Sequence, residues 1–203
     1  MNNNITDRPR SEWSAQDILK EIERCHRTNA EATEAQCLMI VGVTRSGKTK
    51  LIKTYMARYP ARFTDTGTHR PICYITVPLR ATISNLATML LYSLGDPQAH
   101  RGTIADKTHR IINYFQDCGV QMLVIDEVQH CINMCSPRVC IELSNWIKVL
   151  IKETNVACIL VGLQGEAERV LRVNSQLARM FKEVLVLVAP AAPGNERVIL
   201  RKL

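Results

Sequence analysis

The sequence predicts an α/β fold in which a parallel five-stranded sheet is flanked by helices. Short apolar runs typical of buried strands alternate with helix-like segments along most of the 203 residues. Residues 42–49 form a glycine-containing turn between one such run and a helix-like stretch, and the run 121–125 ends in Asp126 and Glu127. Strands separated by helices pair in parallel, and such sheets bind ligands at the carboxyl ends of their strands.

The predicted elements follow one another in a regular order. Ser14 is a candidate N-cap, with Asp17 in the capping-box position, for a helix that ends near Thr28. The five predicted strands are 37–41, 72–77, 121–125, 156–161 and 184–188. The later predicted helices are 50–58, 83–94, 104–117, one that Pro137 opens, and 165–172. The segment 60–71 is polar and basic, and is predicted to be a connection.

The turn has the composition of a phosphate-binding loop. Its residues are Gly42, Val43, Thr44, Arg45, Ser46, Gly47, Lys48 and Thr49. Glycines allow backbone N–H groups to turn inward around phosphate oxygens, and the lysine is placed to reach the β- and γ-phosphates. Thr49 is a candidate Mg²⁺ ligand at the start of the following helix. The loop therefore predicts binding of ATP, with an ordinary turn between strand and helix as the alternative.

The two carboxylates after the third strand complete this prediction. Asp126 is placed to hold Mg²⁺, and Glu127 is a candidate to polarise the water that attacks the γ-phosphate. Gln164 follows the fourth strand and is a candidate sensor of that phosphate, the alternative being a solvent-facing amide. Together the motifs predict an ATPase.

The overall composition limits the compartment and the partners. The net charge of +7 and the pI of about 9.1 suggest a polyanionic partner such as DNA or RNA, although ATP is itself a polyanion and many basic proteins bind no nucleic acid. No run approaches the roughly 18 apolar residues of a membrane span, so the expected location is the cytoplasm. His130, Cys131, Cys135 and Cys140 lie near one another without a Cys-x-x-Cys pair, so helix and loop packing is favoured over a zinc site.

These motifs and the segments around them resemble the TniB/TnsC transposition ATPases of the AAA+ superfamily, P-loop NTPases found in the bacterial cytoplasm. The resemblance spans residues 37–181 and is carried by the segments 40–49, 72–75, 102–106, 119–127, 160–162 and 175–179. It implies an ATP-dependent homo-oligomer, a ring or a filament, that assembles on double-stranded DNA. It also implies a link between target-selection proteins and a transposase, without DNA cleavage by the chain itself.

The family's functional residues transfer to matching positions. Its phosphate-binding lysine falls on Lys48, its magnesium ligands on Thr49 and Asp126, and its catalytic carboxylate on Glu127. Its DNA-contacting positions suggest Arg80 and Thr103, for which the alternatives are a solvated cation and a helix N-cap.

The family's arginine that reaches a neighbouring subunit's nucleotide falls on Met180. Arg179, one residue earlier, is therefore the candidate for this role, although one helical position rotates a side chain by roughly 100°.

The expected domain organisation has three parts. They are an N-terminal helical extension at 1–36, an AAA+ nucleotide-binding core at 37–189, and the start of a largely absent lid at 190–203. Two other functions stay open from the residues alone. One is a P-loop enzyme with another substrate, such as a small-molecule kinase, and the other is a nucleotide-gated scaffold that hydrolyses ATP weakly and binds a protein partner.

Overall fold

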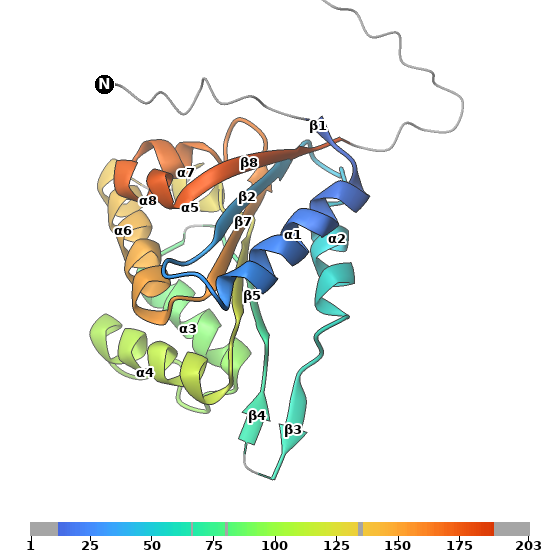
Figure 1. Ribbon diagram of the computed structural model, residues 1–203. Coiled ribbons are helices and arrows are strands. Elements are labelled where there is room, and N and C mark those ends of the chain that lie inside the picture. Colours follow the sequence, from blue (N-terminus) through green and yellow to red (C-terminus); the bar gives the residue numbers. More distant parts are fainter. Residues whose placement is uncertain (1–11, 66, 80, 134–135, 189–203) are drawn as a thin grey trace, which may run out of the picture.

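A six-stranded sheet forms the centre of the computed structural model (Figure 1), which describes residues 12–188 except 66, 80, 134 and 135. Its strand order is β1-β8-β2-β7-β6-β5. The bounds are β1 Glu12–Trp13, β2 Cys37–Gly42, β5 Ile72–Thr76, β6 Met122–Asp126, β7 Ala157–Leu163 and β8 Phe181–Leu187. All five pairings are parallel, so the carboxyl ends of the strands share one edge. The five predicted strands are therefore confirmed, and β1 is a short addition at the β8 side.

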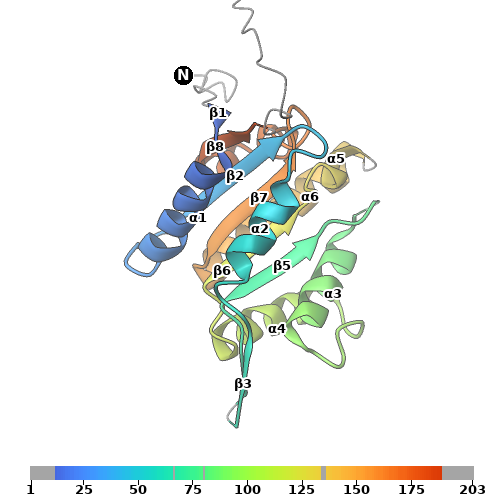
Figure 2. The same cartoon turned by 90° about the vertical axis from the view of Figure 1, so that its right-hand side faces the viewer.

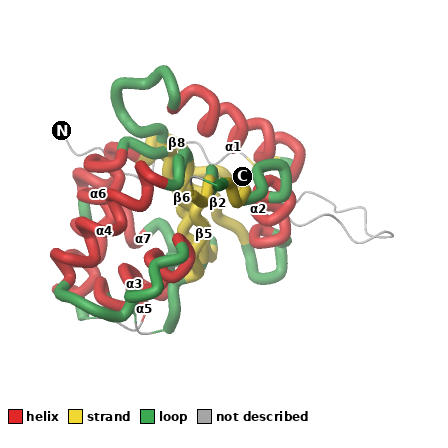
Figure 3. The backbone as a smooth tube through the Cα atoms, turned by 90° about the horizontal axis from the view of Figure 1, so that it is seen from below, coloured by secondary structure: helices red, strands yellow, loops and turns green. Residues whose placement is uncertain are grey.

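Helices cover both faces of this sheet. On one face lie α1 Ala15–Asn29 and α2 Lys48–Met56, and on the other lie α3 Ile83–Leu94, α4 Ile104–Asp117, α5 His130–Asn133, α6 Pro137–Thr154, α7 Arg169–Arg172 and α8 Ser175–Met180. The view along the sheet in Figure 3 shows the two layers with the strands between them. The result is the three-layer architecture that the alternation of elements predicted.

The two cores follow from the alternation of side chains along the strands. In β2, Leu38 and Ile40 face the helices α1 and α2, whereas Met39 and Val41 face the other layer. Each of these four side chains is at most 2 % exposed. A strand buried on both faces has no polar positions to alternate, which explains its continuous apolar sequence.

Helix α1 belongs to the same packed unit as the sheet. Its Ile18 and Ile22 are fully buried in the core on the α2 side. Ser14 caps the helix as predicted, because its side chain accepts a hydrogen bond from the backbone N–H of Asp17 at 3.2 Å. Within the segment expected to be a helical extension, the described residues 15–29 thus form a helix that packs directly on the sheet.

A hairpin, β3 Arg62–Thr64 and β4 Gly67–His69, extends away from the sheet (Figures 1 and 2). The sequence predicted only a connection here. All three residues of β3 are exposed, and Phe63 is 82 % exposed. Because no face of the hairpin is buried, its sequence has no apolar alternation that would indicate strands.

One predicted helix is shorter than expected. The segment 165–172 was expected to be helical throughout, but α7 spans only Arg169–Arg172. Gly165 has a φ of 85°, in the left-handed region, so a right-handed helix cannot start there. The separate helix α8 follows, capped by the side chain of Asn174. Among the helices that the structure describes, none is both long and apolar enough to cross a membrane.

Candidate nucleotide site

The predicted phosphate loop connects the carboxyl end of β2 to the first residue of α2. Gly42 has no room for a side chain, since a Cβ there would lie 2.8 Å from the carbonyl oxygen of Leu187 and 2.8 Å from Ser46 Oγ. Gly47 adopts a φ of 95° directly before the helix, a conformation that glycine reaches without strain. Each of the two glycines is thus required by the local backbone.

Lys48 lies inside the loop. Its Nζ donates hydrogen bonds to the carbonyl oxygens of Gly42 at 3.0 Å and Val43 at 2.9 Å, and contacts Ser46 Oγ at 3.3 Å. Burial lowers the pKa of this ammonium group, and the nearby carboxylates of Glu127 and Asp126 oppose that effect. The structure therefore brings the predicted lysine and the two predicted carboxylates into one electrostatic environment. Thr44 and Arg45 lie exposed on the same loop.

The Asp126 carboxylate accepts three hydrogen bonds within the site. Its Oδ2 accepts hydrogen bonds from Thr49 Oγ1 at 2.8 Å and from the Tyr74 hydroxyl at 2.9 Å. Its Oδ1 accepts from the backbone N–H of Glu127 at 2.8 Å. Asp126 is only 1 % exposed, so these donors replace the water that a carboxylate otherwise binds.

Tyr74 was not predicted as a site residue. Burial raises its pKa to about 12, so the phenol keeps its proton and donates to Asp126. Thr76 Oγ1 in turn donates to the Tyr74 oxygen at 3.0 Å. The sequence signal was a pair of hydroxyl residues two positions apart at the end of a strand, which share one face of the sheet.

Glu127 and Gln129 form a second contact, next to the hydrogen bonds of Asp126. Glu127 has a φ of 59°, which is uncommon for a residue with a side chain. Gln129, which was not predicted as a site residue, donates from Nε2 to Glu127 Oε2. The Gln129 side chain is almost fully buried, at 1 % exposure.

The donor set fits a magnesium nucleotide. A hydroxyl oxygen from Thr49 and a carboxylate oxygen from Asp126 lie within hydrogen-bond distance of each other, and Mg²⁺ prefers oxygen ligands of this kind. The start of α2 offers free backbone N–H groups and the positive end of a helix dipole, both of which favour phosphate. Lys48 adds a positive charge at the same point.

Gln164 and Arg179 lie at different ends of the strands. The backbone N–H of Gln164 donates to the Gly42 carbonyl at 3.2 Å, so Gln164 lies beside the phosphate loop with its side chain exposed. Arg179 is exposed in α8, which precedes β8 and therefore lies at the amino ends of the strands. It lines a hollow of about 590 Å³ together with Lys152, Lys182 and the start of β2. Arg179 is thus at the opposite edge of the sheet from Lys48 of its own chain.

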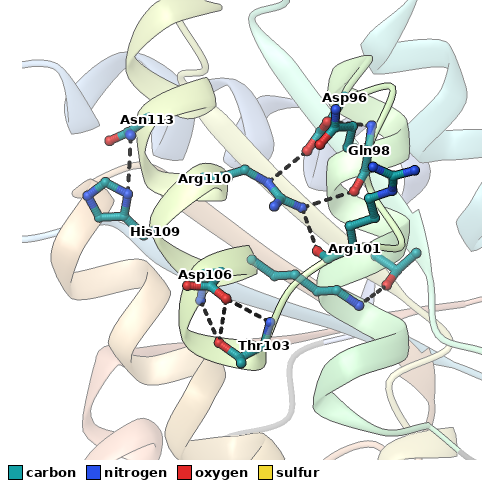
Figure 4. Close-up of polar contacts among 10 residues, drawn as sticks. Asp96, Gln98, Arg101, Thr103, Asp106, His109, Arg110 and Asn113 are labelled. Atoms are coloured by element: carbon teal, nitrogen blue, oxygen red, sulfur yellow. Dashed lines mark hydrogen bonds and ion pairs between the residues drawn. The ribbon is translucent and has the colours of Figure 1, made fainter.

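The two predicted DNA contacts have different outcomes. Thr103 is the N-cap of α4, in a complete capping box with Asp106 (Figure 4). The Thr103 N–H and hydroxyl both donate to Asp106 Oδ2, at 2.9 and 2.8 Å, and the Asp106 N–H donates back to Thr103 Oγ1 at 3.2 Å. Arg80 lies outside the described residues.

The neighbouring helix–helix connection is held by a partly buried ion pair. Arg110 Nε lies 3.0 Å from Asp96 Oδ2, and the same guanidinium donates to the carbonyl oxygens of Gln98 and Arg101 (Figure 4). Asp96 is 5 % exposed. This network fixes the chain that leads into Thr103 and the start of α4.

The cysteine-rich segment has the contacts of ordinary packing. Cys140 Sγ donates to the carbonyl oxygen of Cys131 at 3.2 Å, and Cys135 lies outside the described residues. Over the described part of the chain, no group of three or more His, Cys, Asp or Glu side chains is arranged to hold a metal ion.

Comparisons with solved structures place the fold. The chain has a TM-score of 0.65 to the Aeropyrum pernix ORC2 protein in its ADP form, at 14 % identity, covering 89 % of this chain and 50 % of that one. The Cdc6p of Pyrobaculum aerophilum gives 0.60 at 15 % identity, with 91 % and 48 % covered. The Aeropyrum pernix ORC1 protein in complex with DNA gives 0.58 at 14 % identity, with 85 % and 44 % covered. The chain thus spans about half the length of these proteins and shares their AAA+ core fold.

The sequence itself identifies the family. Among curated proteins, none matches the chain. The family model described as bacterial TniB protein matches residues 7–188. This match includes the phosphate loop, the strand that ends in Asp126, and the helix that carries Arg179. The chain therefore belongs to the TniB family.

Proposed function

We propose that this chain is an ATP-dependent DNA-binding regulator of transposition, which oligomerises on target DNA and links target selection to a transposase. The observation that carries the proposal is the meeting of Lys48, Thr49, Asp126 and Glu127 at the carboxyl ends of β2 and β6. Thr49 and Asp126, 77 residues apart in the sequence, are joined by a hydrogen bond of 2.8 Å. Membership of the TniB family supports the biological role.

Each of these residues has a role in the proposal. Lys48 and the loop N–H groups hold the phosphates, and Thr49 and Asp126 hold Mg²⁺, which neutralises phosphate charge when it is bound. Glu127 orients the attacking water, and Gln164 senses the γ-phosphate from the tip of β7. Solved relatives in fold include an Aeropyrum pernix ORC2 protein with ADPNP and ADP, which supports a nucleotide in this core.

The position of Arg179 supports an oligomer. A side chain at the amino ends of the strands is across the sheet from its own phosphate loop, so its nucleotide partner in the proposal is that of a second copy. The hollow that it lines also carries Arg24, Lys152 and Lys182, together with the carboxylates of Glu34 and Glu183. An arginine supplied from a neighbour stabilises the charge of the transition state in other P-loop enzymes.

The DNA-binding step rests on charge and on the family. The net charge of +7 favours a polyanion, and phosphate contacts from Arg80 and Thr103 would position the protein without reading sequence. ATP bound at a subunit boundary stabilises the oligomer by mass action, and the oligomer presents many cations to DNA together. We therefore expect ATP and DNA to bind cooperatively.

The test is sedimentation of the purified chain on duplex DNA at physiological salt, with ATP, with a non-hydrolysable analogue, and without nucleotide. If large complexes form on DNA only when nucleotide is present, the proposal is supported. Lys48→Ala should abolish them, whereas Lys50→Ala, an exposed lysine of the same helix, should not. Glu127→Gln should keep the complexes and slow phosphate release.

Three other results contradict the proposal in different ways. A chain that stays monomeric under all three conditions argues against assembly on DNA. Nucleotide-dependent binding of a protein with little phosphate release and no effect of DNA favours the scaffold function. Transfer of phosphate to a small acceptor favours a kinase.

A further inference from the structure

The buried side chain of Gln129 joins Glu127 to the carboxyl end of β7. Its Nε2 donates to Glu127 Oε2, and its Oε1 accepts a hydrogen bond of 3.1 Å from the backbone N–H of Leu163. At 1 % exposure, the amide is closed off from water. Both ends of this side chain are therefore used by protein groups, one of which is the predicted catalytic carboxylate.

Chemistry fixes which way this amide points. An ionised carboxylate only accepts hydrogen bonds and a backbone N–H only donates, so the NH₂ group must face Glu127 and the oxygen must face Leu163. The reversed amide would break both contacts and leave buried polar groups without partners, which is costly. The orientation of Gln129 is thus determined by its two neighbours.

Packing holds the side chain in this place. A Cβ on Gly162 would lie 2.6 Å from Gln129 Oε1 and 2.7 Å from the Cβ of Ala167. No side chain at position 162 fits while Gln129 stays where it is. The glycine therefore gives the Gln129 amide the space that it occupies at the tip of β7.

The same strand tip is bonded to the phosphate loop. The N–H of Gln164 donates to the Gly42 carbonyl at 3.2 Å, and Lys48 Nζ donates to that carbonyl at 3.0 Å. A continuous path of hydrogen bonds and one peptide unit thus runs from Glu127 through Gln129 and the end of β7 to the loop. A movement of the phosphate loop can therefore shift the end of β7, the Gln129 amide and the Glu127 carboxylate in turn.

We propose that Gln129 is a positioning residue, which orients the Glu127 carboxylate for hydrolysis and couples it to the phosphate loop through the tip of β7. The inference rests on the proposed ATPase function and adds a residue to it. Gln129 acts through Glu127 and does not itself contact the substrate. Glu127 needs such support because its backbone, at a φ of 59°, lies in the left-handed region.

One substitution separates positioning from packing. Gln129→Met keeps the length of the side chain and removes both hydrogen bonds. Its kcat for ATP hydrolysis should fall about 10- to 100-fold with little change in ATP affinity, because one hydrogen bond to a charged group is lost. The matched control is Gln116→Met, the same change at an exposed position of α4, which should leave kcat unchanged. If Gln129 only packs against β7, Gln129→Met should lower the stability of the chain and leave the kcat of the folded protein unchanged, and that result would overturn the inference.

A spectroscopic measurement tests the contact without nucleotide. In the full chain, the Gln129 side-chain amide signals in a ¹H–¹⁵N spectrum should shift in Glu127→Ala, and exchange of the Leu163 amide should accelerate in Gln129→Met. Unchanged signals and exchange would overturn the inference even if the chain hydrolyses ATP. Conversely, a wild-type chain that binds no ATP would contradict the proposed function, while these spectra would still decide whether Gln129 holds Glu127.

Discussion

Gly162→Ala is the sharpest test of the packing around Glu127, because it adds one methyl group and changes no polar atom. The added Cβ would lie 2.6 Å from Gln129 Oε1 and 2.7 Å from Ala167 Cβ. Ordinary contacts between such atoms are about 3.5 Å or longer. Gln129 must therefore retreat by close to 1 Å, and its 3.1 Å hydrogen bond from Leu163 would stretch beyond the usual range.

The expected loss of stability has two sources, the steric overlap of the added methyl group and the loss of the hydrogen bond from Leu163 to Gln129. Overpacking a core typically costs about 1–3 kcal/mol, and a buried N–H left without its acceptor costs a similar amount. We expect the free energy of unfolding to fall by about 2–3 kcal/mol, because a movement of Gln129 that relieves the overlap also weakens the hydrogen bond. In a chain of this size, the Tm should drop by about 4–12 °C. The kcat should also fall, because Glu127 loses its fixed partner.

A double-mutant cycle measures whether Gln129 is the cause. Urea unfolding and phosphate release are compared for the wild type, Gly162→Ala, Gln129→Ala and the double variant. With the glutamine removed, the added methyl group has space on that side, and only its contact with Ala167 remains. The effects of the two substitutions should therefore be less than additive. Fully additive stabilities, or a Gly162→Ala enzyme with normal kcat, would refute the reasoning.

Three further perturbations test other parts of the molecule. Because the Thr103 hydroxyl caps α4, Thr103→Ala should lower stability by about 1 kcal/mol in thermal unfolding, whereas Thr103→Ser should cost little. If the alanine variant binds DNA with unchanged affinity, Thr103 is not part of the DNA interface. Ile22→Ala should cost about 2–5 kcal/mol in urea unfolding, and a negligible effect would mean that α1 is dispensable for the core. Burial lowers the pKa of His26 below 6.5, so as the pH falls the unfolded chain binds a proton at this residue before the folded chain does. The free energy of unfolding should therefore decrease as the pH drops through 6.5. Denaturation at pH 7.5 and 5.0 should show this decrease, and His26→Gln should reduce it.

The strands were predictable because both of their faces are buried. Residues 37–41 and 122–125 are continuous apolar runs, and each lies within a strand of the sheet. The hairpin of β3 and β4 gave no such signal, since its polarity comes from exposure on every side. The two residues of β1 are held by pairing with β8, whose partner residues lie 174 positions later in the sequence, so no local sequence pattern indicates this strand. Hydrophobic periodicity thus predicts the elements that form the core and misses those that lie outside it.

The residues of the candidate site likewise fall into those that a local sequence motif indicates and those that only the structure brings together. Lys48 and Thr49 lie in one local motif, and the geometry of a glycine-containing loop before a helix makes their roles readable from the chain. Gln129 follows Glu127 by two residues, but its meaning depends on Leu163, which β7 brings to it from 34 positions away. Tyr74 likewise reaches Asp126 only through the pairing of β5 with β6. Contacts that depend on strand register need the structure.

The alternation of side chains across the sheet explains why these contacts can be perturbed separately. Val124 of β6 packs on the side of α1 and α2, so Asp126, two residues later, lies on that side with Thr49. Gln129 packs where Gly162 faces Ala167, whose side chain belongs to the core on the opposite side. Changes at Gln129 or Gly162 should therefore leave the hydrogen-bonded pair of Thr49 and Asp126, the proposed magnesium ligands, in place. If hydrolysis falls in these variants while Mg²⁺-dependent nucleotide binding persists, the cause lies in the orientation of Glu127 and not in a collapsed site.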